Sequence, residues 1–376
     1  MIYFDSASTT PLHPEVLKTY KYLLETYYVN SESLYDPGVK INNLLEQSRE
    51  QISNILGVND NEIIFTSGAS ESNNTLIKGI AFAYQHKGKH LITSNVEHSS
   101  VEGAFKQLQE VFGFDVTYVP VNENGVVEPA VLAKALRKDT ILVSIMSMNN
   151  ETGCMNNLEE LSEVIKENSH AFFHSDCTQS LGKSKLSLNC LDAASFSAHK
   201  INGCKGSGFL YKKSNVQIVP LINGGQQEFD VRGGTNNHPC SIVLAKTVRL
   251  ALESMKEHYQ HVSKLNELMR RELSRMDDVI INSPIDASPY ILNFSCTCMT
   301  SEILLNALND KKIYVSAKST CHSKTRTVSG VLLAMGISEK RASQAIRVSF
   351  SHLNTEKEVL DFIKYLKEIL NGYRIK

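Results

Sequence analysis

Short apolar runs alternate with amphipathic stretches between Pro14 and Tyr211. Ile63–Thr66 and His90–Ser94 are typical runs, and hydrophobic residues at helical spacing follow each of them. We expect strands at residues 63–66, 90–94, 115–121, 141–146, 171–175, 193–197 and 208–211. We expect helices at residues 14–28, 41–56, 70–85, 100–112, 130–136 and 158–167. Buried strands separated by helices predict a layered α/β protein with a parallel sheet.

The pattern changes near residue 240. An apolar stripe through Leu244, Val248 and Leu265 predicts one long, mostly continuous helix over residues 241–274. Mixed strand and helix signals follow at residues 290–294, 301–308, 331–335 and 356–370. The last third of the chain therefore predicts a smaller α+β domain.

Composition narrows the class of protein without changing this prediction. The 376 residues carry a net charge of −1, so no overall field would recruit nucleic acid or an anionic membrane. No apolar run is long enough to cross a bilayer, and the N-terminus lacks the features of a secretory signal. The eight cysteines are dispersed, with no paired metal-binding spacing. We expect reduced thiols in a cytoplasmic protein without a metal site.

A glycine-containing turn joins an expected strand to an expected helix at Thr66–Asn74. Gly68 allows the turn to close, and the amides that open the next helix would point at a common centre. Such a centre suits an anion, above all a phosphate, and Ser70 adds a hydroxyl group. An ordinary helix cap is the alternative interpretation.

Lys200 ends the apolar strand that begins at Ala193, and the glycine-rich segment 203–208 follows it. A lysine at such a strand end can be desolvated, which lowers its proton affinity and makes the amine a nucleophile toward carbonyl groups. A surface lysine beside a loop is the alternative. The polar groups that follow the other strands favour the nucleophile.

Those polar groups should share one crevice, because the carboxyl ends of parallel strands meet at one edge of a sheet. Asp176 and Gln179 follow one strand, Glu97–His98 follow another, and Asn149–Gly153 follow a third. The carboxylate could hold a pyridinium N–H, and the imidazole could stack on a flat ring and move protons. Taken one at a time, a helix cap, a structural histidine and a turn are the alternatives.

Together these segments resemble the class V, fold-type I pyridoxal-phosphate enzymes, and among them the NifS/IscS-type cysteine desulfurases. The matching segments occur in the family's order along nearly the whole chain. They are Asp5–Pro11, Thr66–Asn74, Glu97–His98, Asn149–Glu151, His174–Gln179, Ser197–Lys200, Gly224–Glu228, Arg232–Asn236 and Arg347. The resemblance implies a large, mainly parallel sheet of the seven-stranded type in a domain of residues 12–245. Residues 1–11 and 246–376 are expected to form the small domain.

The resemblance also implies roles for the residues around the cofactor's ring. Lys200 is expected to form the Schiff base, and Asp176 to pair with the pyridine nitrogen. Gln179 and Asn150 are expected to bond at or near the phenolic oxygen. His98 is expected to stack on the ring and to act as an acid and base.

Further residues are implied at the phosphate and at the substrate. Ser70, Ser197, His199 and the amide of Ala69 are expected to hold the phosphate. The family places the counterpart of Thr235 at the phosphate of a neighbouring subunit, which implies a homodimer. Arg347, whose forked guanidinium suits a carboxylate, and Asn30 are the expected substrate-binding residues.

Cys321 lies in the polar segment Val315–Ser323, where Lys318 and His322 favour the thiolate. The resemblance aligns it with the family's persulfide-forming cysteine. The implied reaction takes sulfur from L-cysteine, leaves L-alanine, and places the sulfur on Cys321. The residues between Cys321 and Arg347 resemble the longer-loop desulfurases, which swing the persulfide to a partner. An iron–sulfur scaffold or an enzyme of tRNA or thiamine thiolation would be the acceptor.

The chain departs from the family pattern at several positions, and alternatives stay open. The departures are Ser6, Ser8, Cys204, Lys318, Thr320, the pair Ser351–His352, and the segment Asn30–Tyr35, which lacks the family's usual proline and histidine. One alternative is another class V enzyme, such as a selenocysteine lyase or an aminotransferase. Another is a catalytically impaired dimer that serves as a platform for sulfur relay.

Overall fold

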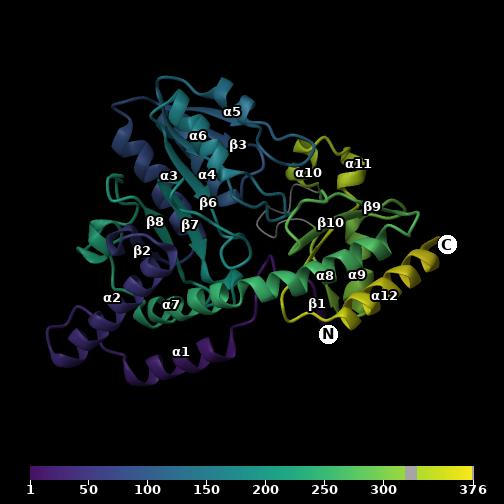
Figure 1. Ribbon diagram of the computed structural model, residues 1–376, viewed down its shortest axis with the longest axis horizontal. Coiled ribbons are helices and arrows are strands. Elements are labelled where there is room, and N and C mark those ends of the chain that lie inside the picture. The colour runs from purple at the N-terminus through teal and green to yellow at the C-terminus, as the bar shows by residue number, and fades with distance from the viewer. Residues whose placement is uncertain (318–327, 375–376) are drawn as a thin grey trace.

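A computed structural model describes residues 1–317 and 328–374. The larger part of the molecule is built around a seven-stranded sheet (Figure 1). The strand order is β2-β8-β7-β6-β5-β3-β4. The strands are β2 Ile63–Thr66, β3 His90–Ser94, β4 Asp115–Val119, β5 Thr140–Ser144, β6 Phe172–Asp176, β7 Ala193–Ser197 and β8 Gly208–Lys212. β8 is antiparallel to both neighbours, and the other neighbouring pairs are parallel. The predicted seven-stranded, mainly parallel sheet is confirmed.

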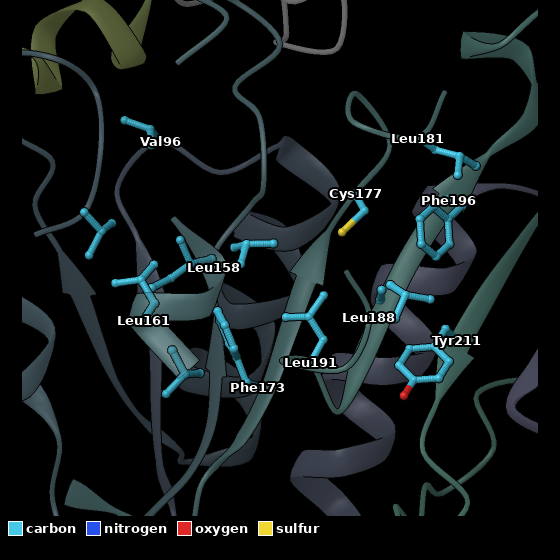
Figure 2. Packing of buried hydrophobic residues seen from close by; sticks show 14 of the residues in the cluster. Val96, Leu158, Leu161, Phe173, Cys177, Leu181, Leu188, Leu191, Phe196 and Tyr211 are labelled. Atoms are coloured by element: carbon cyan, nitrogen blue, oxygen red, sulfur yellow. The ribbon is translucent and has the colours of Figure 1, made fainter. Parts of the chain in front are cut away.

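Helices cover both faces of the sheet. Neighbouring residues of one strand point to opposite faces, so an apolar run is buried on both sides. Ile64 and Leu91 pack with helices α3 and α4 in one core cluster, whereas Phe65 and Ile92 belong to the cluster on the other face. The second cluster also holds residues of α5, α6 and α7. Figure 2 shows part of it, with Phe173 near the helix residue Leu161.

The helices of this part begin close to the expected positions, with one exception. They are α1 Pro14–Thr26, α2 Asp36–Leu56, α3 Ala69–Tyr84, α4 Ser99–Phe112, α5 Pro129–Ala135 and α6 Leu158–Asn168. Helix α2 begins five residues before the expected start at residue 41, since Asp36 and Pro37 form its first turn. The fixed backbone angle of proline suits that position, although the sequence Asp-Pro-Gly reads as a turn.

The remaining elements surround an antiparallel sheet in the order β12-β10-β9. These strands are β9 Val279–Ile281, β10 Ile291–Cys296 and β12 Ala345–Ser349. β1 Ile2–Tyr3 pairs with β11 Ile313–Tyr314 in a two-stranded sheet. The helices are α9 Ser301–Asp310, α10 Gly330–Ala334, α11 Glu339–Ala342 and α12 Glu356–Arg374. No helix of the described residues is long and apolar enough to cross a membrane.

The expected helix over residues 241–274 is two helices, α7 His238–Glu253 and α8 Met255–Leu273, which meet at Ser254. Figure 1 shows them running from the large sheet toward the small one. We propose that the chain divides here into two domains. Val248 packs in the core of the large sheet, whereas Val262 packs with Phe4 in the core of the small one. The N-terminal residues belong to the small domain in this proposal.

Candidate active site

A cavity of about 370 Å³ opens where the strands β6 and β7 end. We call it the cofactor cavity. Ten of the residues expected at the site line it together, although they come from segments far apart in the sequence. They are Ala69, Ser70, His98, Asn150, Asp176, Gln179, Ser197, His199, Lys200 and Arg347.

The N-terminus of helix α3 forms one wall of this cavity. The first backbone bond of the helix runs from the Ser72 amide to the Gly68 carbonyl at 3.0 Å, so the amides of Ala69 and Ser70 have no partner within the helix. Gly68 has a φ of 138°, and a Cβ on Gly208 would lie 2.6 Å from the Gly68 Cα. Glycine at these two positions lets the turn pack against β8, and the result is a nest of amides for an anion.

Asp176 is the last residue of β6, and its buried carboxylate is fixed on both oxygens. Asn73 donates to Oδ2 at 2.7 Å, and the Thr178 amide donates to Oδ1 at 3.0 Å. Beneath it, His174 bonds Ser144 and Ser195 through its two ring nitrogens, and burial lowers its pKa to about 4. The imidazole of His174 is therefore neutral at neutral pH.

His98 caps helix α4, and the cap decides where the neutral ring carries its proton. The Ser100 amide donates to Nδ1 at 3.2 Å, so the proton of the neutral ring lies on Nε2. The neighbouring Glu97 is fully buried, where Ser94 and the Met146 amide donate to Oε1. Burial raises the pKa of Glu97 to about 8, so this carboxyl is mostly protonated at neutral pH.

A chain of hydrogen bonds links Lys200 to a second lysine. Lys200 Nζ donates to the carbonyls of Ala7 at 2.7 Å and Ser8 at 2.6 Å. Gln179 Nε2 donates to the same Ala7 carbonyl at 3.0 Å, while Gln179 Oε1 accepts from Lys183 Nζ at 2.9 Å. Burial, together with Lys200 and Arg347, lowers the pKa of Lys183 to about 7. Nothing in the local sequence indicated this role for Lys183.

Burial and the nearby Lys200, Lys205 and Lys183 also lower the pKa of His199 to about 4. Its Nδ1 lies 3.1 Å from Thr9 Oγ1. The neutral ring faces the cofactor cavity near Ser197 and Ser70, which line it too.

Arg347 reaches the cavity from the middle of β12 and is 2% exposed. It pairs with Asp5 Oδ1 at 2.8 Å and donates to Ser8 Oγ at 2.6 Å and the Asn150 carbonyl at 2.9 Å. Its Nε is buried without a partner among the described residues. Ser8, one of the departures from the family pattern, thus accepts a hydrogen bond directly from the guanidinium.

Two of the expected site residues are not part of this arrangement within one chain, and a third lies outside the described residues. Asn30 and Thr235 are exposed and do not line the cofactor cavity within one chain. Cys321 lies in 318–327, outside the described residues. Conversely, Met146 and Met148 line the cavity although sequence reasoning missed them, because apolar residues carry no chemical signal.

Three comparisons place the chain among known proteins. The family model described as Aminotransferase class-V matches residues 2–362. A NifS/IcsS protein homolog of Lactobacillus delbrueckii subsp. bulgaricus is 41% identical over 99% of this chain and 98% of its own length. The cysteine desulfurase IscS of Dictyoglomus turgidum is 38% identical over 99% of this chain and 95% of its own length.

Solved structures of similar proteins have the same fold as this chain. A NifS-like protein is 36% identical, covers 99% of both chains, and superposes with a TM-score of 0.93. SspA in complex with cysteine is 32% identical and superposes with a TM-score of 0.83 over 94% of this chain and 100% of its own.

The fold and the cavity are those of a fold-type I pyridoxal-phosphate enzyme. The chain belongs to the class V aminotransferase family, and several of its relatives carry the names NifS and IscS.

The residues of the cofactor cavity fit pyridoxal phosphate. Thr178 Oγ1 is buried beside the cavity without a partner in the described residues, and the nest at Gly68 offers amides to a phosphate. Asp176 lines the same cavity and offers a carboxylate that can hold a pyridinium N–H. No group of three metal-ligating side chains occurs in the part of the chain that the structure describes.

Proposed function

We propose that the protein is a pyridoxal-phosphate-dependent cysteine desulfurase that leaves its sulfur on Cys321. In the net reaction, L-cysteine and the Cys321 thiol give L-alanine and a Cys321 persulfide. The substrate's C–S bond breaks, an S–S bond forms, and the carbon that lost sulfur takes up a proton. The single observation that carries the proposal is the convergence of Lys200, Asp176, His98 and Arg347 on one cavity.

The bound cofactor supplies an electron sink for charge that develops on the substrate. Asp176 stabilises that sink by holding a positive charge on the ring nitrogen, and Asn73 and the Thr178 amide hold the carboxylate in place. Gln179 and Asn150 would bond at or near the phenolic oxygen of the ring, while Ala69, Ser70, Ser197 and His199 would hold the phosphate.

Lys200 and His98 move the protons. Lys200 would hold the cofactor, and its amine is placed to carry a proton to and from the substrate carbon. His98 presents Nε2 to the cavity, because its Nδ1 is used in the cap of α4. Hydrogen bonding at Nδ1 thus selects the nitrogen that does the chemistry.

Arg347 clamps the substrate carboxylate, which offers the buried Nε a partner. The ends of the described chain on either side of Cys321 lie at the same wall. Ser316 exchanges backbone hydrogen bonds with Arg347, and Ser329 Oγ donates to Glu151. The described residues on both sides of Cys321 therefore lie near the proposed substrate clamp, which supports Cys321 as the sulfur acceptor.

The proposal includes a homodimer in which Thr235 reaches the partner's phosphate. Thr235 is exposed in one chain, and a run of apolar side chains is exposed on α1, α2 and the segment between them. These helices extend from one end of the molecule (Figure 1). The exposed residues are Leu17, Tyr22, Leu24, Tyr28, Leu34, Tyr35 and Val39.

The decisive experiment compares Cys321→Ser with a matched control, Cys298→Ser, using L-cysteine labelled in its sulfur. We expect the parent and Cys298→Ser to carry labelled persulfide and to release alanine. Cys321→Ser should carry none and release alanine at least about a hundredfold more slowly, because the nucleophile is lost. Undiminished alanine release by Cys321→Ser would refute the persulfide mechanism.

The same label identifies the acceptor. Labelled protein is mixed with an iron–sulfur scaffold or a tRNA-thiolation enzyme, and we expect the sulfur to move to one of them. Retention of the label with both would remove these two classes of partner.

A further inference from the structure

A second cavity, of about 260 Å³, also has Lys200 in its wall. We call it the histidine cavity because His13, His258 and His352 line it. They come from the start of α1, from α8 and from the segment after β12. No Asp or Glu of the described residues lines it. It is thus surrounded by basic groups and hydrogen-bond donors, without a counter-charge of its own.

Two buried hydroxyl groups in this wall have no hydrogen-bond partner in the described chain. They are Ser6 Oγ and Tyr290 Oη, and both residues are at most 5% exposed. A buried hydroxyl without a partner is costly, so each indicates a group that the protein alone does not supply. Ser6 and His352 are also positions at which the chain departs from the family pattern.

Two of the histidines, His258 and His352, carry little charge in the free protein. The rings of His258 and His352 stack with centroids 3.9 Å apart and planes 4° apart. Burial, with His258, His13 and His261 nearby, lowers the pKa of His352 to about 4, and burial also lowers that of His258. The Glu15 amide donates to His13 Nδ1, so the neutral ring of His13 carries its proton on Nε2.

We propose that the histidine cavity binds a small tetrahedral oxyanion, held by His13, His258 and His352 with the hydroxyls of Ser6 and Tyr290. Such an anion accepts hydrogen bonds from several directions and supplies the missing negative charge. The cavity has room for it and for several waters, each of which takes roughly 30 Å³ in the liquid. The site goes beyond the desulfurase activity, since none of its three histidines lines the cofactor cavity.

Binding should be linked to proton uptake. An anion beside the stacked rings favours their charged forms, so the pKa values of His258 and His352 rise in the complex. The affinity therefore increases as the pH falls. The other titratable groups nearby are Lys183 in the wall, Lys200, which the proposed function engages with the cofactor, and His261 and Glu257 on α8. Of these, Glu257 is the group that opposes the anion.

The test is calorimetric titration of the cofactor-loaded protein with sodium sulfate at pH 6 and pH 8, with chloride at matched ionic strength as the blank. The cofactor fills the competing phosphate nest. We expect the affinity to be at least about tenfold higher at pH 6, for one linked proton. The binding heat should also depend on the buffer, because protons are taken up.

Two variants locate the ion. His352→Phe keeps a flat ring against His258 but removes its donor, and should weaken binding by at least about tenfold. Tyr290→Phe removes one hydroxyl with little risk to folding and should weaken it severalfold. His170→Phe, at an exposed histidine, is the matched control and should bind as the parent does.

Several results would overturn the site: no sulfate binding, the same affinity at both pH values, or parental affinity in both variants. Complete displacement of sulfate by L-alanine would place the ion at Arg347 instead and overturn it as well. None of these measurements depends on turnover, so the proposed desulfurase activity stands or falls separately.

Discussion

The two cavities that share Lys200 differ in how their charges are matched. In the cofactor cavity, Asp176 accepts two hydrogen bonds and Arg347 is paired with Asp5. In the histidine cavity the basic groups face one another, and burial lowers the pKa of His352 and Lys183. Matched charges keep a site rigid and ready for a ligand, whereas unmatched ones make its charge depend on the ligand.

The largest effect is expected at the residue that both cavities share. Lys200→Ala should lower alanine release at least about a thousandfold, because the covalent anchor and proton carrier are lost. Borohydride reduction of the parent, followed by peptide mapping, should place the cofactor on residue 200. Lys256→Ala, at an exposed lysine, is the control. A parental peptide labelled at any other residue would contradict the assignment.

The second largest effect is expected when Arg347, which pairs with Asp5 in the cofactor cavity, loses its charge. Arg347→Gln should raise KM for cysteine by about a hundredfold, because a charged hydrogen bond to the substrate carboxylate is worth up to about 3 kcal/mol. The fall in kcat should be smaller. Arg249→Gln, at the protein surface, serves as the control for steady-state kinetics. A fall in kcat at unchanged KM would show that Arg347 does not clamp the substrate.

Lys183 lines the histidine cavity and reaches the cofactor cavity through Gln179. Its lowered pKa of about 7 means that it gains a positive charge as the pH falls through neutrality. The absorbance of the bound cofactor should then change severalfold less with pH between 6 and 8 in Lys183→Met than in the parent. Lys185→Met is the exposed control. Identical pH profiles in Lys183→Met and the parent would remove this link.

The smallest effect is expected at Glu97, beside His98, and it concerns the stability of the fold rather than the activity. The raised pKa of Glu97 favours its protonated form in the folded state, so the parent loses stability as the pH rises from about 4.5 through about 8. Glu97→Gln does not titrate, and its free energy of unfolding should fall less over that range. Urea unfolding at pH 6 and pH 9 measures the difference, with the exposed Glu110→Gln as control. If the difference in unfolding free energy between Glu97→Gln and the parent does not grow with pH, Glu97 is ionised in the folded protein.

The local sequence was sufficient to predict the bounds of three strands in which every residue is buried. The expected strands at 63–66, 90–94 and 193–197 have the bounds of β2, β3 and β7, because each is an apolar run with polar residues after it. β12 was missed, since Arg347 interrupts its pattern. The break at Ser254 was missed as well, because the apolar spacing continues across it from α7 into α8.

Most of the cofactor cavity could be expected, because its residues between Ala69 and Lys200 lie in segments that follow strands of the large sheet. Arg347 was expected from the family resemblance alone. The histidine cavity could not, since Ser6, His13, His258 and His352 come from separate parts of the chain. They meet only because residues 6–13 bond both to Ser349 in β12 and to the segment after β7. The role of Lys183 depends on the fold in the same way. Its charge is set by burial among other cations, which no local pattern records.

The two backbone hydrogen bonds between Ser316 and Arg347 have a mechanical consequence. The strand that carries Arg347, the substrate clamp in our proposal, also holds the described chain that leads to Cys321. In the proposed function, one strand therefore positions both the substrate's carboxylate and the start of the segment that contains Cys321.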